Sequence, residues 1–274
     1  MPCMLPFLLL GGAFAASESQ PHFHRGVLKP YELRPPDILL STQDERLLKS
    51  GRAVTHLLEG EGDARRMIMV QDIKAPSQVV LSRIMDFEKY DEMVSNVDSC
   101  VNYASYHEGR TQTIKSAYEI SALHFKFKYF MRHTYDPVQR CVVFSLDYDR
   151  RSDLDDSVGY WYVQPGSRNN CRVFYSCECK LRGWVPRPVI NMLQKEALKK
   201  ATTWVNDESL KQWHASRACA TNDALVRFVD NIRSAAPNLK LHPRLAARHR
   251  AAVQFVSNVR TQRGRAKPIS THSF

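Results

Sequence analysis

The sequence lacks the short motifs that mark the commonest kinds of enzyme active site. GxSxG, HExxH, the Walker A loop and GxGxxG are all absent, so nothing points to a hydrolase nucleophile, a zinc protease, a phosphate loop or a dinucleotide fingerprint. His107, His124 and His133 are interpreted as lying near strand ends or at outward positions, with no carboxylate or nucleophile partner evident in the sequence. We therefore predict no catalytic residue and no cofactor.

Metal-binding and disulfide patterns are missing as well. The chain has seven cysteines, and the closest pair, Cys177 and Cys179, has i, i+2 spacing rather than the CxxC spacing of zinc sites. The acidic run at residues 147–156 lacks the glycine and the terminal Glu of a calcium loop. We interpret the cysteines as buried free thiols and the acidic run as a solvated turn, and we predict no metal site.

Acidic residues are absent from the end of the chain. Residues 235–274 contain eight Lys and Arg but no Asp or Glu, whereas the formal net charge of the whole chain is +11. Residues 224–232 and 243–259 show helical periodicity, and a basic amphipathic helix is typical of binding to a membrane surface or a partner. We expect peripheral contact with an anionic membrane through residues 235–274; a merely solubilising tail is the alternative. Nucleic acid is an unlikely partner because no reading motif accompanies the charge.

No apolar run is long enough to span a membrane as a helix. In residues 1–16 a short apolar run precedes Ala13, Phe14 and Ala15, which fit the cleavage site of a secretory signal peptide. The same stretch resembles the bipartite plastid presequence of algae with secondary plastids. We expect entry into the secretory pathway, with plastid, secreted and endomembrane destinations left open.

What the sequence does contain, from about residue 65, is a series of strand-like segments. A strand at residues 67–73 precedes two short helices near residues 77–94. Apolar and polar residues then alternate in six further segments, and the alternation favours an antiparallel sheet covered on one face only. The six segments are residues 97–107, 110–121, 123–134, 141–149, 158–164 and 171–181. Residues 17–40 lack periodicity and are interpreted as a linker, and residues 44–58 as a short helix or hairpin beside the domain.

One long helix is predicted over residues 185–213. Its apolar residues recur at steps of three or four, which places them on one helical face; they include Ile190, Leu193, Ala197, Ala201 and Trp204. The order of the elements predicts an α+β fold in which a curved antiparallel sheet wraps around a long C-terminal helix. The predicted divisions are a targeting peptide (1–16), an N-terminal extension (17–64), a domain (65–213) and a basic tail (214–274).

This order of elements resembles the START-like, helix-grip superfamily, and in particular its polyketide cyclase and coenzyme Q-binding branch. The resemblance covers about residues 65–213. It implies non-enzymatic binding or transport of a hydrophobic ligand, such as a lipid or an isoprenoid quinone, between sheet and helix; a cyclase or aromatase is the alternative. The resemblance rests on residues 73–76 (IKAP), 86–90 (DFEKY), 159–163 (GYWYV) and 183–186 (GWVP).

The inward positions predicted for the sheet and the long helix are rich in aromatic residues. Together with the resemblance they predict a pocket in which tyrosine hydroxyls orient an oxygen of the ligand. The alternative is that these rings only fill a core. The predicted ligand-binding residues are Tyr118, Phe125, Phe127, Tyr129, Phe144, Leu146, Trp161, Tyr175, Cys177, Leu193, Ala197, Ala201 and Trp204.

Overall fold

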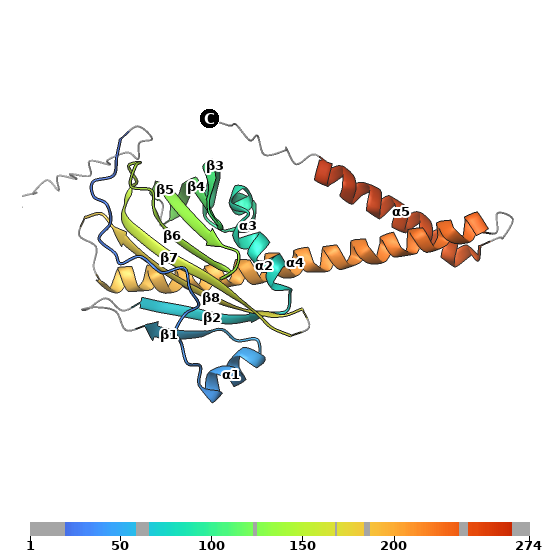
Figure 1. Ribbon diagram of the computed structural model, residues 1–274, viewed down its shortest axis with the longest axis horizontal. Coiled ribbons are helices and arrows are strands. Elements are labelled where there is room, and N and C mark those ends of the chain that lie inside the picture. The colour runs from blue at the N-terminus through green and yellow to red at the C-terminus, as the bar shows by residue number, and fades with distance from the viewer. Residues whose placement is uncertain are drawn as a thin grey trace, which may run out of the picture. The chain divides into compact units, whose positions relative to one another are not determined.

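The computed structural model describes residues 20–58, 66–122, 125–167, 169–183, 187–235 and 241–264 (Figure 1). Within these ranges it leaves out the side chains of residues 57–58, 122, 125, 187–199 and 260–264. The predicted targeting peptide (1–16) therefore lies outside the described residues. The chain divides into two compact units, Met1–Ser209 and Leu210–Phe274, and each is treated by itself.

The first unit is built on one antiparallel sheet of eight strands in the order β1-β2-β8-β7-β6-β5-β4-β3. Short helices follow β2, and a long helix follows β8, so the predicted α+β, helix-grip fold is confirmed. The strands are β1 (Val54–Leu58), β2 (Arg66–Ile73), β3 (Val97–Glu108), β4 (Thr111–Ala122), β5 (Phe125–Asp136), β6 (Cys141–Leu146), β7 (Leu154–Pro165) and β8 (Cys171–Leu181).

Strands β3 to β8 follow one another as hairpins, which is why neighbours in the chain are neighbours in the sheet. The turn between β3 and β4 contains Gly109 with φ of 60°, a left-handed conformation that glycine adopts without strain. Among the strands, two boundaries differ most from the sequence-based ones. The sheet begins at Val54 rather than near residue 65, because β1 pairs with β2. Strand β7 begins at Leu154 rather than at residue 158.

Three short helical segments lie between β2 and β3: α2 (Ser77–Ile84), the 3-10 turn η1 (Phe87–Lys89) and α3 (Tyr90–Met93). They bury Val80, Ile84, Phe87 and Tyr90. The Tyr90 hydroxyl donates to the carbonyl oxygen of Ile84 at 2.5 Å, which ties α3 to the end of α2.

The outer face of the sheet is covered over β1, β2 and β6 to β8, where a wet face was expected, whereas on β4 and β5 the outward Glu119, Lys126 and Arg132 are exposed as expected. Helix α1 (Thr42–Lys49) and the segment before it pack on this face, because they carry apolar side chains that match those of the strands beneath. The segment at residues 20–40 is therefore packed against the domain, although its sequence shows no periodicity. The buried cluster comprises Leu48, Val54, Ile68, Val70, Cys141, Tyr160 and Phe174, and Tyr31, Leu33, Ile38 and Leu40 lie against it.

Polar contacts also hold the segment at residues 20–40 to the sheet. The carboxylate of Asp156 is fully buried; its Oδ2 accepts from the backbone N–H groups of Val27 and Leu28 at 2.7 and 2.8 Å. Its Oδ1 accepts from the Tyr148 hydroxyl and the Ser157 N–H, both at 2.8 Å. The acidic run at residues 147–156 is thus not the solvated turn predicted from the sequence.

Helix α4 (Arg187–Ala235) crosses the inner face of the sheet in the first unit (Figure 1). Trp204 and Val205 are buried there, and the Thr202 hydroxyl lies 3.0 Å from the sulfur of Met69 on β2. The helix continues beyond Trp213, where the sequence-based helix ended. No proline or glycine interrupts residues 214–235, and Pro237 follows the last turn.

The second unit contains the last part of α4 and helix α5 (Pro243–Gly264). Its buried side chains are Val229 on α4 and His249, Ala252 and Val256 on α5. Among the helices that the structure describes, none combines the length and the apolar character needed to cross a membrane.

Candidate ligand-binding site

The aromatic wall of the site is centred on Trp204 of α4. Its ring lies 5.1 Å from that of Tyr90 and 6.2 Å from that of Trp161, both edge-on. The Trp161 ring in turn lies 4.0 Å from that of Tyr175 on β8, the strand that pairs with β7. Edge-to-face and offset contacts of this kind stabilise aromatic clusters, so this wall is a packed aromatic layer between helix and sheet.

A second group of inner-face side chains is desolvated but not fully covered. Burial raises the pKa of the Tyr129 hydroxyl and of the Cys179 thiol, and raises the pKa of the Cys177 thiol to about 11. Yet all three side chains keep accessible surface and are only half-buried. These three side chains are therefore shielded from bulk water although part of their surface is left uncovered.

Tyr129 lies where β6 has ended and β5 runs beside β7. The Asp153 N–H donates to the Lys128 carbonyl at 2.9 Å, and the Lys128 N–H donates to the Asp153 carboxylate at 2.7 Å. This contact brings Tyr129 toward the β8 cysteines although β5 and β8 are not neighbours in the sheet. Within the described residues, the Tyr129 hydroxyl has no hydrogen-bond partner.

A polar pair continues the inner face away from Tyr129. The ring of Tyr118 stacks on that of Tyr129, with centroids 5.1 Å apart. The Tyr118 hydroxyl lies 3.3 Å from Nε2 of His133. Burial lowers the pKa of His133 to about 3, so its imidazole is neutral at physiological pH. The pair can exchange a hydrogen bond with a neutral ligand but carries no charge.

Charge is excluded from this side of the sheet. On β2 and on β4 to β8, the described positions that share a face with Tyr129 and Trp161 carry no Asp, Glu, Lys or Arg. Gly159 lies on the same face and leaves room for the ring of Phe144, because a Cβ at residue 159 would lie 1.9 Å from that ring. The site therefore suits an uncharged molecule, since a buried charge without a partner is costly.

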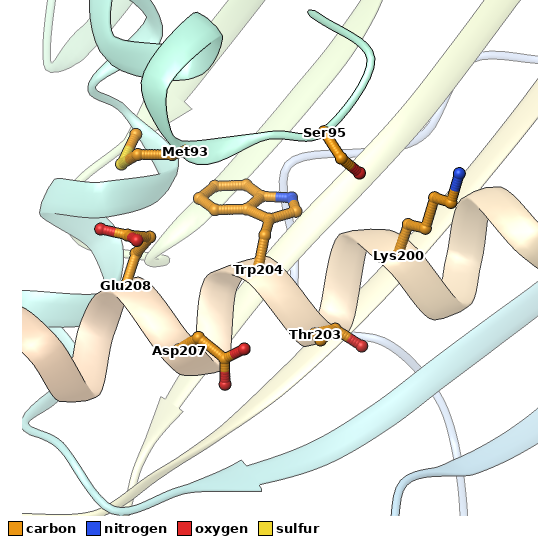
Figure 2. A pocket seen from close by; sticks show the side chains of 7 residues that line it. All are labelled: Met93, Ser95, Lys200, Thr203, Trp204, Asp207 and Glu208. Carbon is orange, nitrogen blue, oxygen red and sulfur yellow. The ribbon is translucent and has the colours of Figure 1, made fainter. Parts of the chain in front are cut away.

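An open cleft of about 290 Å³ lies on the other side of Trp204 (Figure 2). Figure 2 shows the indole between α4 and the chain that follows α3. Charged side chains at the rim and an aromatic floor make this cleft amphipathic. Its lining residues are Met93, Ser95, Lys200, Thr203, Trp204, Asp207 and Glu208.

Most of the predicted ligand-binding residues share the inner face. Tyr118, Leu146, Trp161, Tyr175, Ala201 and Trp204 are buried, and Phe127, Tyr129, Phe144 and Cys177 are half-buried. Phe125 lies in β5 and Leu193 and Ala197 lie in α4, but their side chains are outside the described residues. The role of this set in ligand binding stays a prediction.

Sequence reasoning missed His133, which was interpreted as lying near a strand end or outward but is 6% exposed on the inner face. The signal was available, because the alternation of β5 through Phe127, Tyr129 and Met131 reaches His133 at the next step. Tyr90 was also missed, since nothing in its sequence shows that α3 brings its ring to Trp204.

Comparison with known proteins bears on the first unit. The sequence profile of a family described as "Polyketide cyclase / dehydrase and lipid transport" matches residues 73–203. This range starts at the end of β2, includes the three short helices and β3 to β8, and ends in α4 at Thr203, one residue before Trp204. No curated protein sequence matches the chain.

Several solved structures are similar to the chain at low identity. A START superfamily protein from Mycobacterium smegmatis is 14% identical, with a TM-score of 0.47, covering 58% of this chain and 98% of its own. Human STARD10 is 13% identical, with a TM-score of 0.46 and coverage of 64% and 81%. The Zhui aromatase/cyclase from Streptomyces sp. R1128 is 11% identical, with a TM-score of 0.43 and coverage of 60% and 93%. Residues 73–203, most of the helix-grip sheet and the start of α4, are therefore similar to the family described as polyketide cyclase / dehydrase and lipid transport.

Proposed function

We propose that the first unit binds a neutral, hydrophobic ligand in the space between the inner face of the sheet and α4, and acts as a carrier. The observation that carries this proposal is that the side chains of Tyr129, Cys177 and Cys179 are desolvated but not covered, from which we infer a hollow bordered by the three. Ligand sites are normally apolar spaces with a few placed polar groups. The family match supports a hydrophobic ligand.

The side chains around the hollow favour a ligand with one hydrogen-bonding oxygen. The Tyr129 hydroxyl is a donor without a partner among the described residues, and leaving such a group unpaired in a buried site is unfavourable. An oxygen of the ligand would satisfy it. An isoprenoid quinone, which the coenzyme Q-binding resemblance implies, or another neutral lipid meets both requirements.

The proposal is tested by native mass spectrometry and lipid extraction of the full chain, followed by uptake of a long-chain quinone and a labelled lipid. Cys177→Phe and Cys179→Phe would fill the hollow and should reduce uptake strongly. Cys219→Phe, the same change on α4 in the second unit, is the matched control and should not. Tyr129→Phe keeps the ring and should weaken binding of the quinone without abolishing it.

Two results would contradict the carrier proposal. One is that repeated preparations contain no ligand and take up neither probe. The other is that Cys177→Phe and Cys179→Phe bind as well as Cys219→Phe, which would show that the space they fill is not the site. Melting curves of all variants separate a filled site from a destabilised fold.

A cyclase is the second candidate, and the Tyr118–His133 pair is the observation that favours it. Acid–base catalysis works best with a group whose pKa is near the working pH, whereas the pKa of His133 is about 3. We therefore infer that the pair binds a ligand oxygen rather than transferring a proton. The test is whether the wild type cyclises a poly-β-ketone probe. Cyclisation that is lost in a folded His133→Phe variant would show that the protein is a cyclase.

A further inference from the structure

The second unit holds nearly all the excess charge of the protein. Residues 210–274 contain twelve Lys and Arg and two Asp, out of a formal net charge of +11 for the whole chain. The remainder of the chain is therefore close to neutral, and electrostatic attraction to an anionic partner belongs to this unit.

Its two helices pack as an antiparallel pair. Val229 of α4 and His249, Ala252 and Val256 of α5 are buried, and Figure 1 shows α5 folding back along the end of α4. Nε2 of His249 lies 3.4 Å from the Asp230 carboxylate, which fixes the level at which the two helices meet. At this register Phe228 is level with Ala251, and Ala224 is level with Phe255.

Each helix carries an exposed stripe that ends in a phenylalanine. On α4, Arg217, Ala224 and Phe228 have the spacing i, i+7, i+11, and all three are exposed. On α5, Arg244, Arg248, Ala251 and Phe255 have the spacing i, i+4, i+7, i+11, and all four are exposed. Such spacings place residues on one side of a helix. Phe228 and Phe255 are 57% and 36% exposed.

The two stripes lie on the same face of the pair. Each is displaced by about −100° around its helix from the buried positions, at 100° per residue. When two right-handed helices pack antiparallel, flanks displaced in the same sense meet on the same side, as e meets e in an antiparallel coiled coil. The centre of this face is then apolar and consists of Ala224, Phe228, Ala251 and Phe255. Arg217 lies at one end of it, and Arg244 and Arg248 lie at the other.

The opposite flank is different in character. Asp223 and Asp230, the two acidic residues of the unit, are displaced in the other sense from Val229. The stripe face is therefore free of carboxylates among the residues that the structure describes. We call it the Arg–Phe face, and it consists of Arg217, Ala224, Phe228, Arg244, Arg248, Ala251 and Phe255.

We propose that the Arg–Phe face docks the protein on the surface of an anionic bilayer. Paired arginines bind lipid phosphates, while two exposed phenylalanines enter the boundary between head groups and acyl chains, as in interfacial amphipathic helices. This combination favours a membrane over a soluble polyanion, because a soluble polyanion gives the phenylalanines no apolar environment. The proposal is independent of the ligand site, since it concerns side chains of the second unit alone.

Vesicle sedimentation of the full chain tests the proposal, with phosphatidylcholine vesicles and vesicles that also contain phosphatidylglycerol. Binding should require the anionic lipid and fall as salt rises. Phe228→Ser with Phe255→Ser, and Arg244→Ala with Arg248→Ala, should each weaken binding by about tenfold. The matched control, Arg227→Ala with Arg250→Ala, removes the same charge from exposed positions outside the Arg–Phe face and should stay within about twofold of the wild type.

Three outcomes would overturn the proposal. Equal losses in the two arginine pairs would mean that net charge, rather than a face, drives binding. Equal binding to neutral vesicles would remove the anionic requirement. Binding to duplex DNA that is tighter than binding to vesicles, and unaffected by the phenylalanine changes, would assign the unit to nucleic acid instead. Circular dichroism of each variant is the control that its helices are still formed.

Discussion

The hydroxyl of Tyr118 lies 3.3 Å from Nε2 of His133, and neither group can carry a charge at neutral pH. Burial raises the pKa of Tyr118 well above its ordinary value and lowers that of His133 to about 3. The ring of His133 also stacks on that of Phe87, with centroids 4.0 Å apart. A neutral imidazole packed among aromatic rings makes the stability of the fold depend on pH.

The first prediction is that His133 destabilises the fold as the pH falls. The unfolded chain takes up a proton near pH 6.5, but the folded chain does so only near pH 3. Stability contributed by the neutral form is therefore complete above pH 6.5 and declines by about 1.4 kcal/mol per pH unit below it. His133→Phe should remove this part of the slope in urea unfolding between pH 6.5 and 4. Parallel curves for variant and wild type would show that His133 titrates normally.

Much of the fold could be predicted because the alternation of apolar and polar residues in β3 to β8 records which side of the sheet is buried. The pattern fails where both sides are buried. Phe174 and Ser176 of β8 are covered by the segment at residues 20–40, so their burial depends on contacts with a stretch that has no periodicity of its own. No local pattern encodes such a contact.

The candidate site was predictable in its aromatic residues but not in its polar geometry. Tyr129 and Trp161 follow from strand alternation. The hollow that we infer beside Tyr129 depends on β6 ending at Leu146, which lets β5 approach β7. The nearness of Tyr90 to Trp204 depends on the angle at which α3 leaves α2. Both are properties of tertiary packing, so single-sequence reasoning misses them.

The second prediction concerns Trp204, which is 8% exposed and contacts the rings of Tyr90 and Trp161. Trp204→Ala removes a large buried ring and leaves a cavity, so it should lower the free energy of unfolding by about 3–5 kcal/mol. Phe228→Ala, at a 57% exposed position, is the control and should change it little. A similar small effect from both would mean that the aromatic wall around Trp204 does not stabilise the fold.

The third prediction concerns Gly159, whose missing side chain makes room for the ring of Phe144. Gly159→Ala should destabilise the protein by about 1–3 kcal/mol, because the new methyl group would overlap the ring. Phe144→Leu in the same chain should recover part of the loss, since the smaller side chain vacates that space. Chemical unfolding of the two single variants and the double variant measures the coupling, and strictly additive effects would contradict the close packing of the two residues.

The last prediction concerns Asp156, whose carboxylate joins the segment at residues 20–40 to the sheet. The two oxygens accept four hydrogen bonds, from the N–H groups of Val27, Leu28 and Ser157 and from the Tyr148 hydroxyl. Asp156→Asn turns one acceptor into a donor that faces other donors, which should cost about 1–3 kcal/mol.

The loss should be local as well as global, because Val27 and Leu28 belong to the segment that would be released. Limited proteolysis should cut residues 20–40 of Asp156→Asn faster than those of the wild type. Asp37→Asn changes an exposed carboxylate of the same segment and should leave the cleavage rate unchanged. If Asp156→Asn resists proteolysis as well as Asp37→Asn does, the segment is held mainly by the apolar contacts of Tyr31 and Leu33, and the buried carboxylate is not its anchor.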